Sequence, residues 1–110
     1  MTQEEKELLL KDLCARLPYH PIFKLKDGTM PLYNVNTYVG VIDCFPPIKI
    51  EDCRLYLRPM SSMTEEEKKE LSHYDNSVQR TDFFYSHHID CRFMIEKGLA
   101  LEAPEGMYNW

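Results

Sequence analysis

The chain lacks the features that mark several large classes of protein. Its four glycines, Gly28, Gly40, Gly98 and Gly106, stand far apart, which excludes a glycine-rich phosphate loop and a G-x-S-x-G nucleophile elbow. Its four cysteines form no C-x-x-C pair, which favours reduced thiols over a disulfide framework. No apolar run approaches the roughly 18 residues that a membrane span needs, and the acidic start does not resemble a secretory signal. We therefore expect a cytoplasmic protein with no membrane partner.

The chain also has fewer basic than acidic residues. Thirteen Lys and Arg residues face eighteen Asp and Glu residues, which gives a formal net charge of −5 at pH 7. A broad phosphate-binding surface needs an excess of basic side chains, so the charge disfavours nucleic acid as a partner. What the chain does have is 110 residues, of which 44% are hydrophobic, and this suffices for one domain with a single core.

The first segment of the chain has strong helix signals. Thr2 and Glu5 have the spacing of a capping box, in which each side chain accepts a hydrogen bond from the other residue's backbone amide. The apolar side chains that follow at helical spacing would form one buried stripe, which consists of Leu10, Leu13, Cys14 and Leu17. The charged residues Asp12 and Arg16 fall elsewhere on the circumference. We predict an amphipathic helix over residues 3–17.

Residues 22–58 change to short runs of β-branched, aromatic and aliphatic residues separated by turn residues, which is typical of a small antiparallel sheet. Asp27-Gly28 suits a hairpin turn, because glycine tolerates the positive φ that tight turns need. The most strand-like run is TYVGVIDCF at 37–45. We predict an α+β fold in which a small antiparallel sheet, a meander or an SH3-like barrel, is packed by the N-terminal helix and by C-terminal helices. All of it is expected in a single domain spanning residues 1–110.

Past the midpoint of the chain, the nine residues MTEEEKKEL at 63–71 nearly repeat its first nine, MTQEEKELL. A true internal repeat would change the fold prediction, but the likeness ends after one or two helical turns. Thr64 and Glu67 again have capping-box spacing, so we interpret both copies as the same way of starting a helix. The predicted helix over residues 64–74 has little apolar surface, which makes it a candidate partner-facing element.

The C-terminal part is predicted to be helical over residues 82–98. Asp90 is placed to cap a helix over residues 91–97, and Gly98 fits the left-handed position of a Schellman motif that would end it. The flanking segments that we expect to be irregular are a polar connector, DNSVQRT at 75–81, and a turn-rich tail at 99–110.

The densest group of reactive side chains is SHHIDC at 86–91. If this stretch were helical, His87 and Cys91 would share one face at i, i+4, a spacing that suits two ligands of one metal ion. His87, His88 and Cys91 are therefore candidate metal ligands, and Cys91 beside a histidine base is a candidate nucleophile. Because no second ligand pair has metal spacing, the simpler interpretation is that Asp90 caps a helix and Cys91 is a small buried hydrophobe. We expect no catalytic residue and no cofactor.

Aromatic residues supply the candidate contacts with a partner. Aromatic side chains are enriched at protein interfaces, and the candidates here are Tyr33, Tyr38, Tyr56, Tyr108 and Trp110. Another possibility is a basic aromatic face for single-stranded nucleic acid, formed with Lys24, Lys26, Lys49, Arg54 and Arg58. The net negative charge favours ordinary solvated strand faces over that possibility.

Three stretches of the chain together resemble a known group of proteins. They are KDLCARLPY at 11–19, YLRPMSSMTEEEKKEL at 56–71 and IEKGLALEAPEGMY at 95–108. In these stretches, roughly a third of the chain, the sequence resembles a family of small uncharacterised proteins of gut anaerobic bacteria and of their prophages or other mobile elements. The resemblance implies no activity, cofactor or catalytic residue.

Taken together, these patterns predict a non-catalytic interaction or regulatory protein of a bacterial mobile element, which binds an unknown protein partner. The alternatives are a metal- or thiol-dependent enzyme centred on His87, His88 and Cys91, and a binder of single-stranded nucleic acid.

Overall fold

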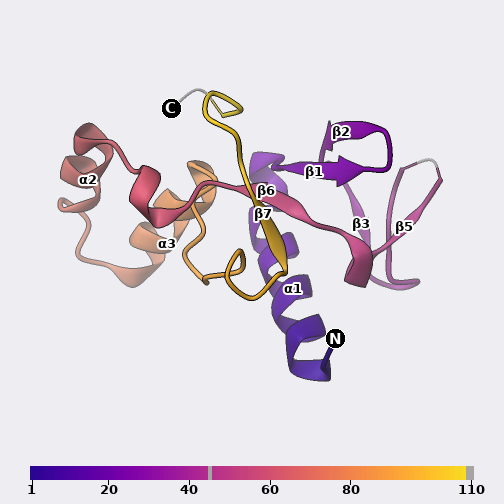
Figure 1. Cartoon of the computed structure of the whole chain (residues 1–110). Helices are drawn as coiled ribbons and strands as arrows, with labels where there is room; N and C mark the ends of the chain where they lie inside the picture. The colour runs from indigo at the N-terminus through magenta and orange to yellow at the C-terminus, as the bar shows by residue number, and fades with distance from the viewer. Residues whose placement is uncertain (45, 109–110) are drawn as a thin grey trace. The chain divides into compact units, whose positions relative to one another are not determined.

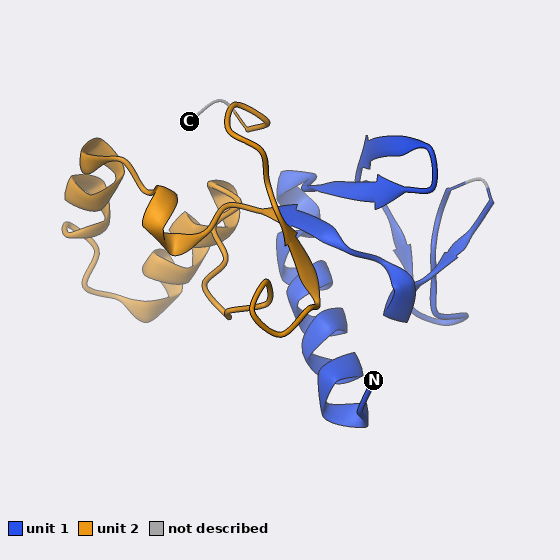
Figure 2. Ribbon diagram, viewed as in Figure 1, with its two compact units in different colours: residues 1–56 blue, residues 57–110 orange. Residues whose placement is uncertain are grey.

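The computed structural model describes residues 1–44 and 46–108. Within these residues the chain forms three α-helices and seven short strands, which confirms the predicted α+β class (Figure 1). The residues divide into two compact units, Met1–Tyr56 and Leu57–Trp110, which are called unit 1 and unit 2 below (Figure 2). The single domain expected from the sequence stays a prediction.

Unit 1 begins with helix α1 (Gln3–Arg16), and the predicted capping box starts it. The Thr2 hydroxyl accepts from the Glu5 amide at 3.1 Å, and the Thr2 amide donates to Glu5 Oε1 at 2.9 Å. The helix continues as a 3-10 turn over Leu17–Tyr19, close to the end that the sequence predicts. These local hydrogen bonds satisfy amides that the first helical turn would otherwise leave without partners.

The buried stripe of α1 differs from the predicted one. The buried residues are Leu9, Asp12, Leu13 and Arg16, whereas Cys14 is exposed. Asp12 Oδ2 accepts from Arg16 Nε at 2.9 Å, so two charged residues one helical turn apart are buried as an ion pair. Because each charge neutralises the other, neither has to face water, and the pair is buried beside Leu13 of the predicted stripe while Leu10 and Leu17 are half-buried.

The strands of unit 1 form two small antiparallel sheets. The elements that follow α1 are β1 (Ile22–Leu25), β2 (Gly28–Pro31), β3 (Val35–Asn36), β4 (Val41–Ile42), β5 (Ile48–Lys49), a 3-10 turn (Ile50–Asp52) and β6 (Leu55–Leu57), whose last residue belongs to unit 2. One sheet has β1 between β2 and β6, and the other is a meander in the order β3-β4-β5. The predicted small sheet is therefore divided, and only its second part is a meander.

Turn chemistry explains where these strands begin and end. The β1–β2 hairpin turns at Lys26-Asp27, one residue before the predicted Asp27-Gly28, because Gly28 already pairs with Leu25 as the first residue of β2, and Pro31 closes this edge strand. The long strand predicted at 37–45 is wrong for its described residues 37–44, of which only Val41–Ile42 pairs as a strand, and Phe45 lies outside the described residues. The residues before that pair make the turn between β3 and β4 instead.

The regular elements of unit 2 are mostly helices. Its elements are a 3-10 turn (Met60–Ser62), α2 (Glu65–Leu71), α3 (Ser77–Ser86) and β7 (Ala100–Glu102). The small core of the unit joins α2 to α3 and consists of Leu71, Phe83 and Ile89, with Met63, Tyr74 and Phe84 packed against it. The backbone amide of Ala103, just after β7, donates to the Leu57 carbonyl at 2.8 Å.

Two helix predictions in unit 2 are corrected. The supposed connector at 75–81 contains the start of α3, because Asn76 Oδ1 accepts from the Val78 amide at 2.7 Å and caps the helix. Residues 91–97, predicted to be a helix, form a series of turns. The Schellman bonds around Gly98 are present after these turns, with the Gly98 amide donating to Ile95 at 3.1 Å and that of Leu99 donating to Met94 at 2.9 Å.

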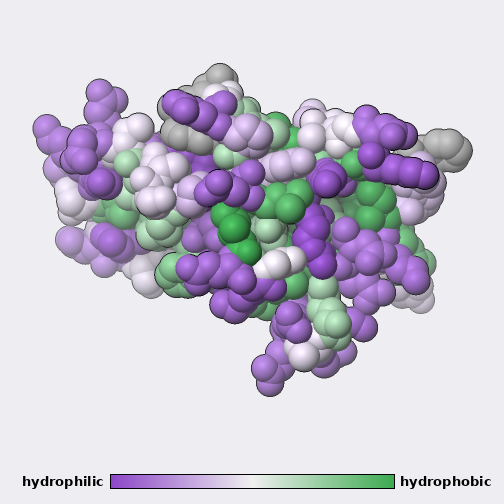
Figure 3. All heavy atoms as spheres, in the orientation of Figure 1, coloured by the Kyte–Doolittle hydropathy of each residue, from purple (hydrophilic) through white to green (hydrophobic). Residues whose placement is uncertain are grey.

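On the face drawn in Figure 3, hydrophilic side chains cover much of the surface and hydrophobic ones show in smaller areas. Among the described helices, none combines the length and the apolar character that crossing a membrane would require.

Candidate functional site

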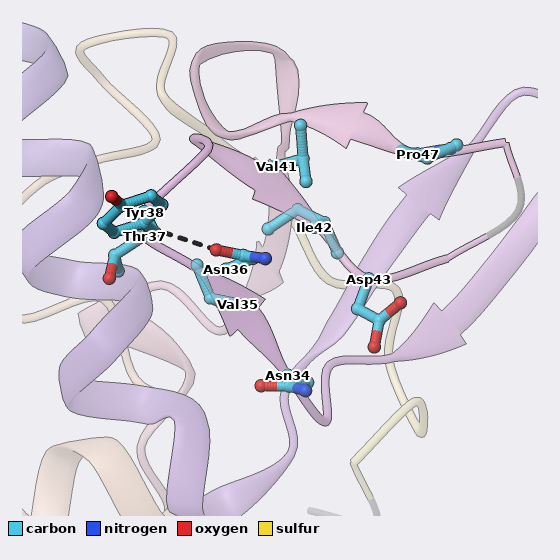
Figure 4. Close-up of a pocket in the computed structure, with 9 residues that line it drawn as sticks. All are labelled: Asn34, Val35, Asn36, Thr37, Tyr38, Val41, Ile42, Asp43 and Pro47. Carbon is cyan, nitrogen blue, oxygen red and sulfur yellow. Dashed lines mark hydrogen bonds between the residues drawn. The ribbon is translucent and has the colours of Figure 1, made fainter.

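The tip of the β3–β4 hairpin in unit 1 is an ordered turn. Asn36 Oδ1 accepts from the backbone amide of Tyr38 at 3.1 Å (Figure 4). The same oxygen accepts from the Val39 amide at 3.3 Å, and the Asn36 carbonyl accepts from the Gly40 amide at 2.9 Å. Gly40 has φ +74°, a conformation that costs glycine little, and its carbonyl accepts from the Ile50 amide at 2.9 Å. Four hydrogen bonds therefore hold residues 36–40, which we call the hairpin tip.

The hairpin tip presents large side chains to solvent. Tyr38 is 97% exposed and Val39, its neighbour, is 62% exposed. Two pockets lie against the tip. A polar one of about 370 Å³ contains Asn34, Thr37 and Asp43 (Figure 4).

The second pocket at the tip is more apolar. It has a volume of about 440 Å³, and Leu10, Val39 and Ile50 contribute its apolar lining. An ion pair between Lys6 Nζ and Glu51 Oε2, 3.2 Å long, lies among the lining residues, and Lys6 lowers the pKa of the Glu51 carboxyl by its hydrogen bond and its charge. An exposed aromatic and aliphatic pair beside a pocket of this kind has the geometry of a contact surface.

The structure separates the five aromatic residues that the sequence proposes for partner contact. Tyr33 and Tyr38 are both exposed in unit 1, close to opposite ends of β3, and the Tyr33 ring lies 4.6 Å from that of His20. Tyr56 is half-buried, and Tyr108 is half-buried in unit 2. Trp110 lies outside the described residues. Tyr33 and Tyr38 are thus the predicted residues best placed to meet a partner.

Unit 2 contains a charged cluster around a buried arginine. Arg58, 2% exposed, donates from Nη1 to Glu67 Oε2 at 2.8 Å and from Nη2 to Glu67 Oε1 at 2.7 Å. The backbone carbonyls of Ser62 and His87 and the Ser62 hydroxyl accept further bonds from the same guanidinium. Glu67 also closes the capping box of α2, because its Oε1 accepts from the Thr64 amide at 2.9 Å. One carboxylate therefore joins the start of α2 to Arg58.

His87 extends this cluster from the C-terminal end of α3. Its Nδ1 lies 3.1 Å from Glu67 Oε2, and its Nε2 lies 4.0 Å from Glu70 Oε2. The hydrogen bond from Arg58 lowers the pKa of the Glu67 carboxyl from its ordinary 4.5 to about 2, so Glu67 stays charged near neutral pH. A pocket of about 360 Å³ borders these groups, with His88 and others in its lining.

The structure does not place the candidate metal ligands His87 and Cys91 on one helical face with the i, i+4 spacing that the sequence suggested. Helix α3 ends at Ser86, and His88 has φ +60°, so His87 and Cys91 are not on one helical face. The His88 ring stacks on Tyr108 at a centroid distance of 3.9 Å. Among the residues that the structure describes, no group of three or more His, Cys, Asp or Glu side chains is placed to hold a metal ion.

The thiol chemistry also differs from one cysteine to the next. Burial raises the pKa of the Cys53 thiol to about 12, which keeps it protonated and poorly nucleophilic at neutral pH. Cys14 is exposed, and Cys91 is half-buried in the turn that follows Asp90.

The proposed basic aromatic face is reduced by internal bonding. Arg58 is buried in its pair with Glu67, and Arg54 Nη1 donates to the backbone carbonyls of Glu51 at 2.8 Å and Cys53 at 2.9 Å. Lys24, Lys26 and Lys49 are exposed. Two of the five cations named for that face are therefore engaged within the protein.

Sequence reasoning missed the residues that order the hairpin tip. Asn36 reads as an ordinary polar residue, although an Asn followed four residues later by Gly is a signal for a turn closed by a side-chain acceptor. It also missed the second role of Glu67, since a capping-box glutamate gives no sign of a distant arginine. No family model, no curated protein and no solved structure matches this chain, so the case for a function rests on its own residues.

Proposed function

We propose that this chain is a non-catalytic interaction protein that binds a protein partner through the hairpin tip, with Tyr38 and Val39 as the anchoring side chains. The observation that carries the proposal is the 97% exposure of Tyr38 on a turn that four hydrogen bonds hold in place. Tyrosine is among the residues that most often dominate binding energy at protein interfaces.

Two features of the hairpin tip support binding, its fixed backbone and the pocket beside it. A turn fixed by Asn36 and Gly40 loses little conformational freedom when a partner closes over it, so less of the contact energy is spent on ordering. Val39 lines the 440 Å³ pocket, which offers a partner an apolar depression next to the projecting tyrosine. Single exposed hydrophobic residues are common on protein surfaces, but an adjacent pair beside an apolar pocket is a patch.

The proposal includes a cellular setting. The resemblance of residues 11–19, 56–71 and 95–108 to small proteins of bacterial mobile elements is the reason to expect the bacterial cytoplasm and a partner encoded by the host or by the element. That setting determines which lysate to test.

The experiment is affinity capture from a lysate of the native host, followed by calorimetry with the purified candidate. We expect Tyr38→Ala combined with Val39→Ser to weaken binding by about tenfold or more, which is the scale of a hot spot. Val78→Ser is the matched control, because Val78 is also exposed but lies on α3, away from the tip residues in the chain. Capture that survives the double substitution, or steeply salt-dependent binding to single-stranded nucleic acid in place of a protein, would contradict the proposal.

A further inference from the structure

The turns at 90–98 in unit 2 are held by one buried carboxylate. Asp90 Oδ1 accepts from the Met94 amide at 2.8 Å, and Asp90 Oδ2 accepts from the Ile95 amide at 3.0 Å. The Lys97 amide donates to the Phe93 carbonyl at 3.3 Å, and the buried Met94 side chain anchors the turn from within. The backbone of this loop is therefore well defined.

Phe93 is the unusual residue of this loop. It has φ +56°, in the left-handed region that a bulky side chain rarely adopts, and it is 54% exposed. A left-handed backbone at a bulky residue is unfavourable by itself, and here it leaves about half of the Phe93 surface in solvent. That exposed part is available to bury against another molecule.

A groove of about 310 Å³ lies beside this ring. Its apolar lining is Pro59, Met60, Phe93 and Ile95, and exposed carboxylates at its rim are Glu96 and Glu102. Met60 is also exposed. Among the described residues that line the groove there is no lysine or arginine, so its charge is of one sign.

The cations nearest in sequence are engaged elsewhere. Arg92 donates to the Tyr85 hydroxyl, and its guanidinium lies 5.8 Å from the centre of the Tyr85 ring. Lys97 Nζ donates to the Arg92 carbonyl at 3.4 Å. The carboxylates of Glu96 and Glu102 are thus left to attract a cation from outside.

We propose that this groove binds a peptide segment of a partner protein that carries an apolar side chain next to an arginine or a lysine. The apolar side chain enters between Met60, Phe93 and Ile95, and the cation lies over the Phe93 ring and toward Glu96 and Glu102. A neutral or acidic segment would leave the two carboxylates uncompensated. This surface belongs to unit 2, so it stands independently of the hairpin tip in unit 1.

The test begins with a displayed library of random short peptides selected on the folded full chain. The expected consensus pairs Arg or Lys with Leu, Ile, Met or Phe, and the synthetic consensus peptide is then measured by fluorescence anisotropy. Replacing its arginine with citrulline, which keeps the shape and removes the charge, should weaken binding by about tenfold.

Variants of the protein locate the site. Phe93→Gly should weaken binding by about tenfold or more without unfolding the chain, because glycine adopts φ +56° without strain. Glu96→Lys combined with Glu102→Lys should have a similar effect, whereas Tyr38→Ala should leave peptide binding unchanged. If Tyr38→Ala leaves peptide binding unchanged, the groove binds the peptide independently of the hairpin tip, and the two proposals are tested separately.

Three results would overturn the inference. They are selection of acidic or uncharged peptides, selection of no peptide above the background of the display scaffold, and peptide binding that Phe93→Gly leaves intact in a protein with an unchanged melting temperature.

Discussion

Arg58 and Glu67 form a bidentate ion pair, with Nη1–Oε2 and Nη2–Oε1 distances of 2.8 and 2.7 Å, in which Glu67 is also the capping-box residue of α2. Glu5 makes the same capping bonds at the start of α1. The two nearly identical segments therefore differ in one physical respect: the second capping glutamate has a buried arginine as a further partner. This explains why a helix with so little apolar surface is docked.

We predict that Glu67→Gln destabilises the protein by about 3 kcal/mol, because glutamine can still cap the helix but leaves the buried Arg58 charge without compensation. Urea unfolding monitored by circular dichroism gives the free energy of unfolding. Glu5→Gln is the matched control, and its effect should stay within about 0.5 kcal/mol. Equal losses in the two variants would mean that the ion pair contributes nothing beyond capping.

We predict that stability falls in acid with a contribution from Glu67. Its pKa in the folded protein is about 2 against an ordinary 4.5, so the unfolded chain binds a proton first as the pH falls. The stabilisation is therefore complete above pH 4.5 and is lost as the pH falls from there toward 2. The comparison is urea unfolding of the wild type and Glu67→Gln across this range. The stability difference between them should shrink in acid, and a constant difference would refute the assignment.

We predict that breaking the buried Asp12–Arg16 pair on one side is costly. Asp12→Ala should destabilise the folded protein by about 3 to 5 kcal/mol, because the Arg16 guanidinium would remain buried without the carboxylate that neutralises it. Replacing both residues, with Asp12→Leu and Arg16→Met, should cost far less. A double-mutant cycle measured by thermal unfolding checks this, and additive losses would show that the two charges are not coupled.

We predict that Asn36→Ala loosens the hairpin tip without changing its exposed side chains. The substitution removes the acceptor for the Tyr38 and Val39 amides, so these two amides should exchange with solvent faster by about tenfold. Hydrogen exchange by NMR measures this directly and needs no partner. Asn34→Ala is the control, since Asn34 and Asn36 both line the polar pocket of about 370 Å³ but Asn34 lies outside the hairpin tip. Unchanged exchange in Asn36→Ala would mean that other contacts order the turn.

We predict that Cys14 and Cys53 differ sharply in reactivity. Because burial raises the pKa of Cys53 to about 12, iodoacetamide at pH 8 should leave it unmodified in the folded protein and alkylate exposed Cys14. Peptide mass spectrometry identifies the modified residue, and denaturant should make both react. Rapid native alkylation of Cys53 would indicate that its surroundings open easily.

Local signals in the sequence were enough for several parts of the fold. The Thr2 and Thr64 capping boxes and the Schellman bonds at Gly98 are present, and the first hairpin turns within one residue of Asp27-Gly28, because each depends on residues within a few positions of one another. The α+β class followed from the change in hydrophobic period after residue 21. Tyr38, named from the sequence as a candidate contact residue, is 97% exposed, and its contact with a partner stays a prediction.

Other features depend on atoms that are distant in the chain or on competition between local bonds. The Asp12–Arg16 pair shifted the expected buried face of α1, on which Leu13 is buried as expected but Cys14 is exposed, since a charge can be buried once it is paired. Residues 91–97 had helical spacing, but the Asp90 carboxylate and the φ of Phe93 directed them into turns. Arg58 and Glu67 are nine residues apart in the chain, so no local pattern in the sequence indicates their contact.

The sequence alone was therefore sufficient for how α1 and α2 start, for the turn at Gly98 and for the class of fold, because short-range hydrogen bonds and periodic hydrophobicity decide these. Only the tertiary structure decided which charges are buried, that His87 and Cys91 lie on no common helical face, and that Asn36 orders the turn carrying Tyr38. Burial and pairing depend on what the rest of the chain places beside a residue, and this is information that no single segment contains.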